Sequence, residues 1–401
     1  MAVNRVHYDE DFPQDRVDKR RSRRKKARRR MVFRLLTLLI VGILVVTAWQ
    51  NWDTLAPDKL IAKFQDSFGG GAGSYPVDVS GTNAQRLVRC QNYTVLLSDS
   101  YLTFYNDTGG EVKRYICSHT NSLLRHAGRY VLLVEQEGRQ VQLFTRSAPI
   151  IELTTSYDIL SAAVNSKGQM AVLTQGPQGY AVQVTVYDRR GKVLYTRSRN
   201  QQATEVALSP DGKQVALLSV QAENGNLNTT LDVFALDSAA QEAVCSYKTA
   251  DKLLYRAEYL TDGWLAAVGE GGAVLLNTAD GLATVYAPEG KRLLGYAAGD
   301  TTLALVMREY GDTGDGVVQI VDKKGEPLCT VEFTGDFRHL SAQGRQYLLL
   351  TDSAVQEITT LGAGRKAASA ADGQQAVLCG DSGVVLGLNL LQAYPLGKND
   401  Q

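Results

Sequence analysis

The stretch VALSPDGKQVALLS, residues 206–219, joins two apolar runs through a short turn that contains Pro210, Asp211 and Gly212. Short apolar runs on either side of such a turn are typical of a β-hairpin, and glycine supplies the positive φ that a tight hairpin turn requires. This stretch therefore predicts two adjacent, buried β-strands.

The same unit recurs after residue 75. It is found as LLRHAGRYVLLV, AAVNSKGQMAVLT, AEYLTDGWLAAVG, HLSAQGRQYLLLT and ASAADGQQAVLCG, with turns at Gly128, Gly168, Gly263, Gly344 and Gly373, and two looser copies surround Asn92 and Gly299. Successive turns are 36, 40, 44, 51, 36, 45 and 29 residues apart. Eight units in residues 75–401 average about 41 residues each, which is typical of a four-stranded propeller blade.

Residues 204–248 contain a complete unit: TEVALS as the inner strand, KQVALLSV as the second, TTLDVFALD as the third and QEAVCSYK as the outer strand. We therefore predict an all-β fold, a β-propeller of about eight four-stranded blades over residues 75–401, with seven blades as the alternative because the last spacing is short. The last blade lacks one strand, and the extended segment YPVDVSG (residues 75–81) is available to complete it. Closing the ring in this way also removes exposed sheet edges.

The N-terminal region has a different composition. Residues 1–34 hold 13 Lys/Arg and 5 Asp/Glu, and an apolar stretch over residues 31–49 is interrupted only by Arg34. As a helix, 19 residues span roughly 28 Å, close to the hydrocarbon core of a bilayer. We predict one transmembrane signal anchor over residues 31–49. A buried core helix and a cleaved signal peptide are the alternatives, although no small-x-small cleavage site follows the stretch.

Basic residues beside a first membrane span stay in the cytoplasm. We therefore expect a cytoplasmic tail over residues 1–30, a juxtamembrane amphipathic helix and Gly-rich linker over residues 50–74, and an extracytoplasmic body at the cell membrane. Anionic lipid is the expected partner of the tail, worth about 1 kcal/mol per basic residue near the surface. Nucleic acid is the alternative, but the tail lacks aromatic interleaving, zinc ligands and a recognition-helix pattern. The residues expected to set the topology and to contact lipid are Arg20, Arg21, Arg23, Arg24, Lys25, Lys26, Arg28, Arg29, Arg30, Arg34, Trp49 and Trp52.

Ser209, Pro210, Asp211 and Gly212 form an S-P-D-G turn that resembles the inner hairpin of WD40-like and YVTN-type propellers. The G-H and W-D pairs of the WD40 signature are absent, so no subfamily function carries over. The layout of basic tail, single span, linker, YPVDVSG and degenerate blades resembles, over residues 16–401, a family of single-pass membrane propeller proteins of Gram-positive-type bacteria. That family is classed as a domain of unknown function, and it implies no catalytic residues.

No motif predicts catalysis, a cofactor or a metal site. The string GDSGV around Ser382 resembles the nucleophile loop of trypsin-like proteases, but no histidine has the matching context, and we place GDSG in a turn between the second and third strands of its blade. The loop GDTGDG lacks the spacing of a calcium loop. Asp211, Asp262 and Asp372 each precede a turn glycine and are expected on one rim. The five cysteines include no C-x-x-C pair, which argues against a zinc site and a complete disulfide framework.

The sequence favours a non-catalytic binding or scaffolding module for a protein or cell-envelope polymer. One alternative is an envelope polymer hydrolase or lyase that uses rim or channel carboxylates, and another is a membrane-assembly scaffold that acts through the basic tail. Binding residues are often carried on loops. The long turns SVQAENGNLNTT and REYGDTGDGVV are expected between the second and third strands of blades four and six, on a shared rim. Their candidate binding residues are Glu223, Asn224, Asn226, Asp312 and Asp315.

Overall fold

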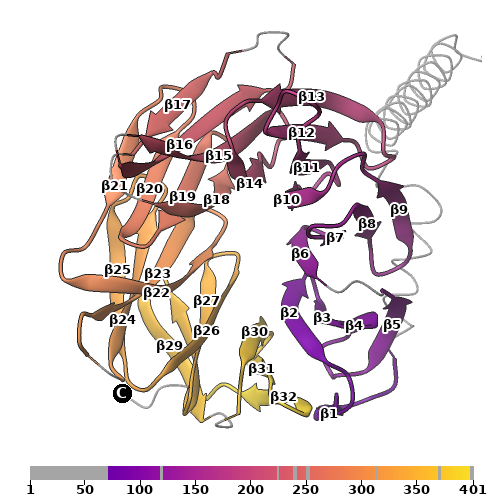
Figure 1. Cartoon of the computed structure of the whole chain (residues 1–401). Coiled ribbons are helices and arrows are strands. Elements are labelled where there is room, and N and C mark those ends of the chain that lie inside the picture. The colour runs from indigo at the N-terminus through magenta and orange to yellow at the C-terminus, as the bar shows by residue number, and fades with distance from the viewer. Residues whose placement is uncertain are drawn as a thin grey trace, which may run out of the picture. The chain divides into compact units, whose positions relative to one another are not determined.

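Eight antiparallel β-sheets of four strands each make up the body of the protein, Gly70–Gln401, in a computed structural model. The structure describes residues 71–117, 121–223, 225–237, 242–249, 253–312, 314–368 and 372–397. In Figure 1 the sheets follow one another around a central axis in chain order. The predicted all-β propeller with eight blades is therefore confirmed.

The first four blades are continuous in sequence, and each runs from its inner to its outer strand. Blade one is β2 (Ala84–Cys90), β3 (Tyr93–Ser98), β4 (Tyr101–Tyr105) and β5 (Glu111–Ile116), and blade two is β6 (Ser122–Ala127), β7 (Tyr130–Glu135), β8 (Gln140–Phe144) and β9 (Pro149–Thr154). Blade three is β10 (Ile159–Val164), β11 (Met170–Gln175), β12 (Val182–Tyr187) and β13 (Val193–Arg199), and blade four is β14 (Ala203–Leu208), β15 (Gln214–Glu223), β16 (Asn226–Ala235) and β17 (Cys245–Lys248).

The next three blades repeat this order, and the eighth departs from it. Blade five is β18 (Leu254–Thr261), β19 (Trp264–Gly269), β20 (Gly272–Asn277) and β21 (Ala283–Tyr286), and blade six is β22 (Lys291–Ala298), β23 (Thr302–Glu309), β24 (Gly316–Asp322) and β25 (Pro327–Phe333). Blade seven is β26 (Phe337–Gln343), β27 (Gln346–Thr351), β28 (Ala354–Thr359) and β29 (Gly362–Ala368), and blade eight is β30 (Gln375–Cys379), β31 (Ser382–Leu386), β32 (Leu390–Pro395) and β1 (Val77–Asp78).

The N-terminal strand β1 closes the ring. It pairs with β32, with Val77 opposite Leu391 and Asp78 opposite Leu390. The Val79 amide also donates to the Asn389 carbonyl at 2.9 Å, and the Val79 side chain is only 2% exposed. The prediction that the segment 75–81 completes the last blade is confirmed.

One predicted turn was wrong. Seven of the eight repeat turns do join an inner strand to a second strand, but Gly373 precedes the inner strand β30, and Gly380 occupies the repeat position instead. Gly380 lies 36 residues after Gly344, so the anomalous spacing of 29 disappears. It follows that GDSG joins the first and second strands of blade eight, not the second and third.

Eight hydrophobic clusters hold the blades together, one between each pair of neighbours. Middle strands are apolar on both faces because they pack against a blade on either side: in β15, Leu217 contacts the cluster shared with blade three and Leu218 the cluster shared with blade five. The cluster between blades eight and one includes Val79 together with Leu87 and Leu391. Closure of the ring therefore buries apolar surface as well as pairing backbone groups.

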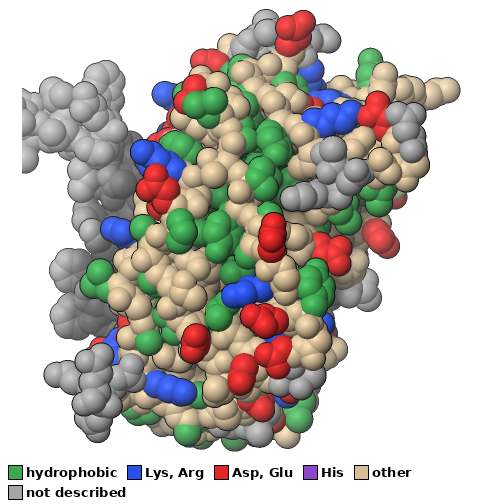
Figure 2. Space-filling model, turned by 90° about the vertical axis from the view of Figure 1, so that its left-hand side faces the viewer, with side chains coloured by type: hydrophobic (Ala, Val, Ile, Leu, Met, Phe, Trp, Pro, Cys, Tyr) green, Lys and Arg blue, Asp and Glu red, His purple; other side chains and the backbone are tan. Residues whose placement is uncertain are grey.

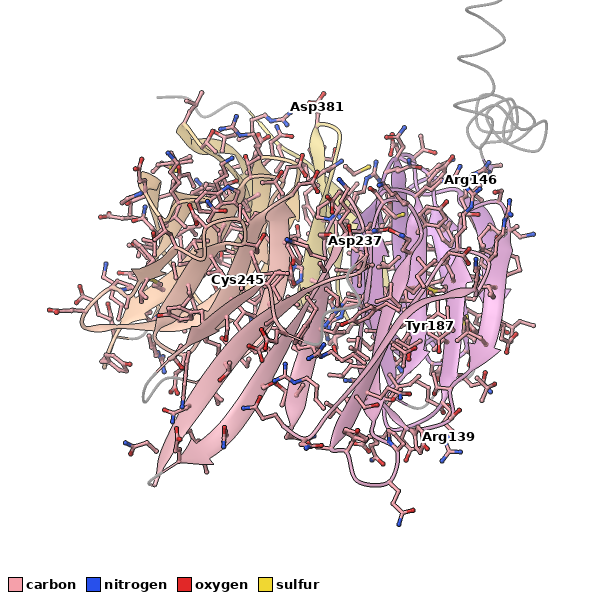
Figure 3. All side chains as sticks on the ribbon, turned by 90° about the horizontal axis from the view of Figure 1, so that it is seen from above. Arg139, Arg146, Tyr187, Asp237, Cys245 and Asp381 are labelled. Atoms are coloured by element: carbon pink, nitrogen blue, oxygen red, sulfur yellow. The ribbon has the colours of Figure 1, made fainter. Side chains whose placement is uncertain are left out.

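Turns between strands lie on two opposite rims. Figure 3 places Arg146, in the β8–β9 turn, and Asp381, in the β30–β31 turn, at one edge of the ring, and Arg139, in the β7–β8 turn, at the opposite edge. Turns between second and third strands thus share the Arg139 rim, where the inner strands also begin.

Within the described residues, no helix is long and apolar enough to cross a membrane. The predicted tail (residues 1–30), span (31–49) and most of the linker (50–70) lie outside the described residues, together with all the basic residues and tryptophans named for them.

Candidate functional site

The axis of the ring contains a cavity of about 600 Å³, to which all eight inner strands contribute. We call this cavity the lumen. Small side chains on several of these strands leave it open, among them Ala163, Ala257, Ala298 and Ser341. Its volume is in the range of small-molecule sites.

Four of the eight inner strands bring a polar residue to the lumen after a β-bulge: Arg86, Glu205, Arg256 and His339. Six of the eight inner strands show a register shift against their second strand. A bulge redirects the side chain that follows it and is frequent near functional sites. The residues that follow the shifts are Arg86, Ser161, Glu205, Arg256, Gly295 and His339.

Glu205, on β14, binds residues of three other inner strands, β6, β10 and β18. Its Oε1 accepts from Arg125 Nη2 at 3.0 Å, and its Oε2 accepts from Arg256 Nη1 at 2.9 Å and from Ser161 Oγ at 2.9 Å. The Glu205 side chain is 5% exposed, whereas those of Arg125 and Arg256 are 25% and 35% exposed. The carboxylate therefore holds two guanidinium groups in fixed positions at the lumen wall.

A second carboxyl group, Glu258, lies on the same side of the lumen. Its Oε1 accepts a hydrogen bond from the Tyr296 hydroxyl at 3.2 Å. Glu258 is open to the lumen rather than to bulk solvent, and this burial raises its pKa, with the nearby charge of Glu205 acting in the same direction. Burial, followed by the charge of Glu258, also raises the pKa of Tyr296, which therefore keeps its proton at neutral pH.

Arg86 faces the same cavity without a partner. Among the described residues, its guanidinium makes no hydrogen bond or ion pair, although Arg89, three residues along the strand, is paired with Asp107. Burial lowers the pKa of Arg86, and the positive charges of Arg125 and Arg256 lower it further. The guanidinium groups of Arg125 and Arg256 thus act on the charged form of Arg86 in the same direction as its burial.

Two histidines face the lumen in their neutral form. Burial, with the added repulsion of Arg125, lowers the pKa of His126 to about 4, and burial together with Arg86 lowers that of His339 to about 4. His339 Nδ1 lies 3.2 Å from the Ala376 carbonyl and 3.3 Å from the Ala376 amide. At neutral pH both imidazoles therefore offer uncharged N–H groups.

The candidate residues of blade four lie on a hairpin arm rather than a flexible loop. β15 and β16 pair without interruption from Gln214 opposite Ala235 to Glu223 opposite Asn226, and Asn224 lies outside the described residues. Glu223 Oε2 accepts hydrogen bonds from Lys248 Nζ and, at 3.0 Å, from Asn228 Nδ2. The bond from Lys248 and its charge lower the pKa of Glu223. The expected twelve-residue turn is thus mostly strand, because its polar residues continue the backbone pairing between β15 and β16.

The candidate residues of blade six lie on the turn between β23 and β24. Buried Arg308 holds this turn: its Nε donates to the Asp315 carbonyl at 2.9 Å and its Nη2 to the Gly335 carbonyl at 3.2 Å. Asp312 and Asp315 are exposed. Both predicted turns join second to third strands and so share the Arg139 rim, as expected.

The remaining sequence candidates occupy structural turns. Asp262 Oδ1 accepts from the Asp211 amide at 2.9 Å, so these two adjacent turns contact each other. Asp372 is different, because it precedes β30 and accepts from the Leu388 amide at 3.1 Å, so its predicted place on the same rim was wrong. Over the described residues, no three His, Cys, Asp or Glu side chains are grouped to hold a metal ion.

The outer face of the ring shows no concentrated patch of one type of side chain in the view of Figure 2. Figure 2, which views the molecule from the left-hand side of Figure 1, shows hydrophobic side chains scattered among acidic and basic ones. Exposed apolar residues on outer strands include Val285 (46% exposed) and Leu328 (42%). Scattered apolar residues are normal on protein surfaces, so the lumen is the better candidate site.

Comparison with known sequences assigns the chain to a family. The profile described as a family of unknown function, DUF5711, matches residues 74–382, which cover the propeller from the bridge at Ser74 to β31. The protein belongs to the DUF5711 family. The expected membership in a family of unknown function is thereby confirmed, whereas its membrane and bacterial aspects stay predictions. No curated protein matches the sequence.

Solved structures share the fold with this DUF5711 protein at low sequence identity. AztD from Citrobacter koseri matches with a TM-score of 0.49 and 12% identity, over 76% of this chain and 90% of that one. The Pan2 WD40 domain of Neurospora crassa matches with a TM-score of 0.46 and 10% identity, over 82% and 98%. Hydrazine synthase of Kuenenia stuttgartiensis matches with a TM-score of 0.44 and 12% identity, over 82% and 99%. Likenesses at this level carry no argument about function.

Proposed function

We propose that this DUF5711 protein is a non-catalytic binding or scaffolding propeller that holds a protein or cell-envelope polymer at the lumen of its ring. The observation that carries the proposal is the network around Glu205, which fixes Arg125 and Arg256 before any ligand is present. Groups that are already in place lose little conformational entropy on binding, so preorganisation favours affinity. Because Glu205 is committed to three hydrogen bonds, it acts as a support for the guanidinium groups.

We further propose that residues 31–49 anchor the propeller in the cell membrane, with residues 1–30 in the cytoplasm and the body outside. The support is the charge-free run beside a strongly basic tail. Protease added to intact cells stripped of their wall is expected to digest the body and spare the tail. Protection of residues 75–401 would contradict this topology, and loss of function on deleting residues 1–30 alone would favour the tail-based scaffold.

Partner capture in cells tests the binding proposal. The full-length chain, carrying a C-terminal affinity tag, is crosslinked in cells and purified from gently solubilised membranes. Two variants are compared with it: Ser341→Trp, which fills the lumen, and a version in which residues 221–228 are replaced by Asn-Gly to shorten the β15–β16 arm.

We expect the lumen-filling variant to lose its partner and the shortened arm to retain it, with both variants melting within a few degrees of the wild type. The opposite pattern would move the binding surface to the rim that carries Glu223 and Asp312. No specific capture by any of the three proteins would overturn the binding function.

A second candidate function is an envelope polymer lyase or hydrolase, favoured by the raised pKa of Glu258 and its hydrogen bond to Tyr296. A carboxyl group that titrates closer to neutral pH is suited to general acid or base catalysis. The purified chain is incubated with envelope polysaccharides while reducing ends and unsaturated products are followed. Turnover that Glu258→Gln abolishes would establish this function and replace the non-catalytic one.

A further inference from the structure

Charge in the lumen is unevenly balanced. Three guanidinium groups, those of Arg86, Arg125 and Arg256, line the cavity, and a fourth, that of Arg89, is paired with Asp107. A single carboxylate, that of Glu205, forms ion pairs with both Arg125 and Arg256. Glu258 is the other acidic residue of the lining, and its raised pKa weakens it as a counterion. The lining therefore carries a net positive charge in a partly enclosed space, where electrostatic interactions are less screened than in bulk water.

Arg86 is exposed to the lumen, and its donors have no protein partner among the described residues. A guanidinium has five N–H donors in a planar fork that matches the two oxygens of a carboxylate or phosphate group. In the described part of the chain no side chain or carbonyl accepts from Arg86, although it lies near enough to Arg125 and Arg256 for their charges to lower its pKa. Holding three guanidinium groups around one cavity is costly without a counterion.

Uncharged donors surround the same space. The Ser341 hydroxyl and the imidazoles of His126 and His339 belong to the lining, whereas the Tyr296 hydroxyl already donates to Glu258. His339 Nδ1 lies within hydrogen-bond distance of the Ala376 backbone, and its Nε2 has no hydrogen-bond partner among the described residues. Neutral donors beside guanidinium groups allow hydrogen bonds to a bound oxyanion without adding charge.

We propose that the lumen is an oxyanion-binding site in which Arg86 receives a carboxylate or phosphate group of the ligand, with Arg125 and Arg256 beside it in positions fixed by Glu205. This inference rests on the proposed binding function and specifies the chemistry of its ligand. A cation would meet surplus positive charge in the lumen, and a neutral ligand would leave Arg86 without a counterion.

Titration calorimetry on the purified full-length chain tests the site. The probes are citrate, inorganic phosphate and mannitol as the neutral control, each measured at low and at raised salt concentration. Arg86→Gln removes the charge, Arg86→Lys keeps it without the planar fork, and Arg190→Gln removes an exposed arginine from the β12–β13 turn as the matched control. Thermal melts of all four proteins establish that each is folded.

The wild type and Arg190→Gln are expected to bind citrate, phosphate or both, more weakly at raised salt concentration, and mannitol not at all. A hydrogen bond to a charged group contributes about 1.5–3 kcal/mol, so Arg86→Gln should weaken binding by roughly tenfold to a hundredfold. The affinity of Arg86→Lys should lie between those of the wild type and Arg86→Gln. Preference for citrate would indicate a carboxylate ligand, and preference for phosphate a phosphorylated one.

Equal affinity in Arg86→Gln and wild type would overturn the site, as would binding of mannitol alone. Absence of binding of either anion, while the crosslinked partner is still captured, would overturn the oxyanion proposal and leave the binding function standing. Anion binding that depends on Arg86, without partner capture in cells, would support the site and count against the wider binding function.

Discussion

Replacing Glu205 with Gln tests how the lumen is organised. The change keeps the size of the side chain but removes the charge that neutralises Arg125 and Arg256. Breaking a buried ion pair costs about 3–5 kcal/mol. Both arginines are partly exposed, at 25% and 35%, so the cost should be discounted for solvent screening to about 2 kcal/mol.

The assay is thermal unfolding of the full-length chain in a phosphate-free buffer. The ring contains 327 residues, and unfolding entropies of about 2.1 cal/mol/K per residue convert 2 kcal/mol into a fall in Tm of roughly 3 °C. Adding phosphate should then narrow the gap between the variant and the wild type, because an oxyanion at the lumen supplies the lost negative charge. Saturation at a hundred times Kd stabilises a protein by about 2.7 kcal/mol.

Glu357→Gln is the matched control. Glu357 is also buried and paired, through its bond to Arg365 at 2.7 Å, but it belongs to the third strand of blade seven and lies outside the lumen lining. Its variant should lose stability in the same way and show no selective recovery in phosphate. An unchanged Tm for Glu205→Gln, or equal recovery of both variants, would refute the reasoning.

Two further predictions concern closure of the ring and its pH dependence. Val79→Asp should lower the free energy of unfolding by at least about 3 kcal/mol in denaturant unfolding, because it places a carboxylate in the cluster between blades eight and one. Ser80→Asp, at the exposed neighbouring position, should lower it by less than about 1 kcal/mol. Similar losses in the two variants would contradict the role of β1 in closing the ring. The pKa of His339 falls from 6.5 to about 4 on folding, so between pH 7 and pH 5 the native state binds fewer protons than the unfolded state. Stability should therefore drop by about 2 kcal/mol for this residue as the pH falls across that range. His339→Gln should flatten that part of the curve, and an unchanged slope would mean that His339 titrates normally.

Much of the fold could be predicted from the sequence because propeller blades repeat at a similar length, about 41 residues here, with glycine in most of their turns. The borrowed strand at residues 75–81 could also be predicted, because the last blade has too few residues. The apolar pattern predicts the final turn at Gly373 because ADGQQAVLCG and GDSGVVLG both show an apolar run beside a glycine turn. Inner and second strands of a propeller are both buried, so the apolar pattern does not distinguish them.

The lumen was not predicted, because its residues meet only when the ring is closed. Arg86, Glu205 and Arg256 come from blades one, four and five, and each follows a register shift that strand periodicity does not reveal. A signal was nevertheless present, since all three are charged residues just before the apolar part of an inner strand. The predicted rim residues follow from turn length, and turn length does not indicate that most of the blade-four turn pairs as strand.

The central claim is that the lumen of this propeller binds an oxyanion-bearing ligand. Its most direct test is a crystal structure of the chain grown with selenate, a tetrahedral oxyanion whose selenium can be located by anomalous scattering. The account predicts an anomalous peak in the lumen, with selenate oxygens within hydrogen-bond distance of the Arg86 guanidinium, and loss of that peak in Arg86→Gln. Selenate found only on the outer surface, with the lumen holding water alone, would contradict it.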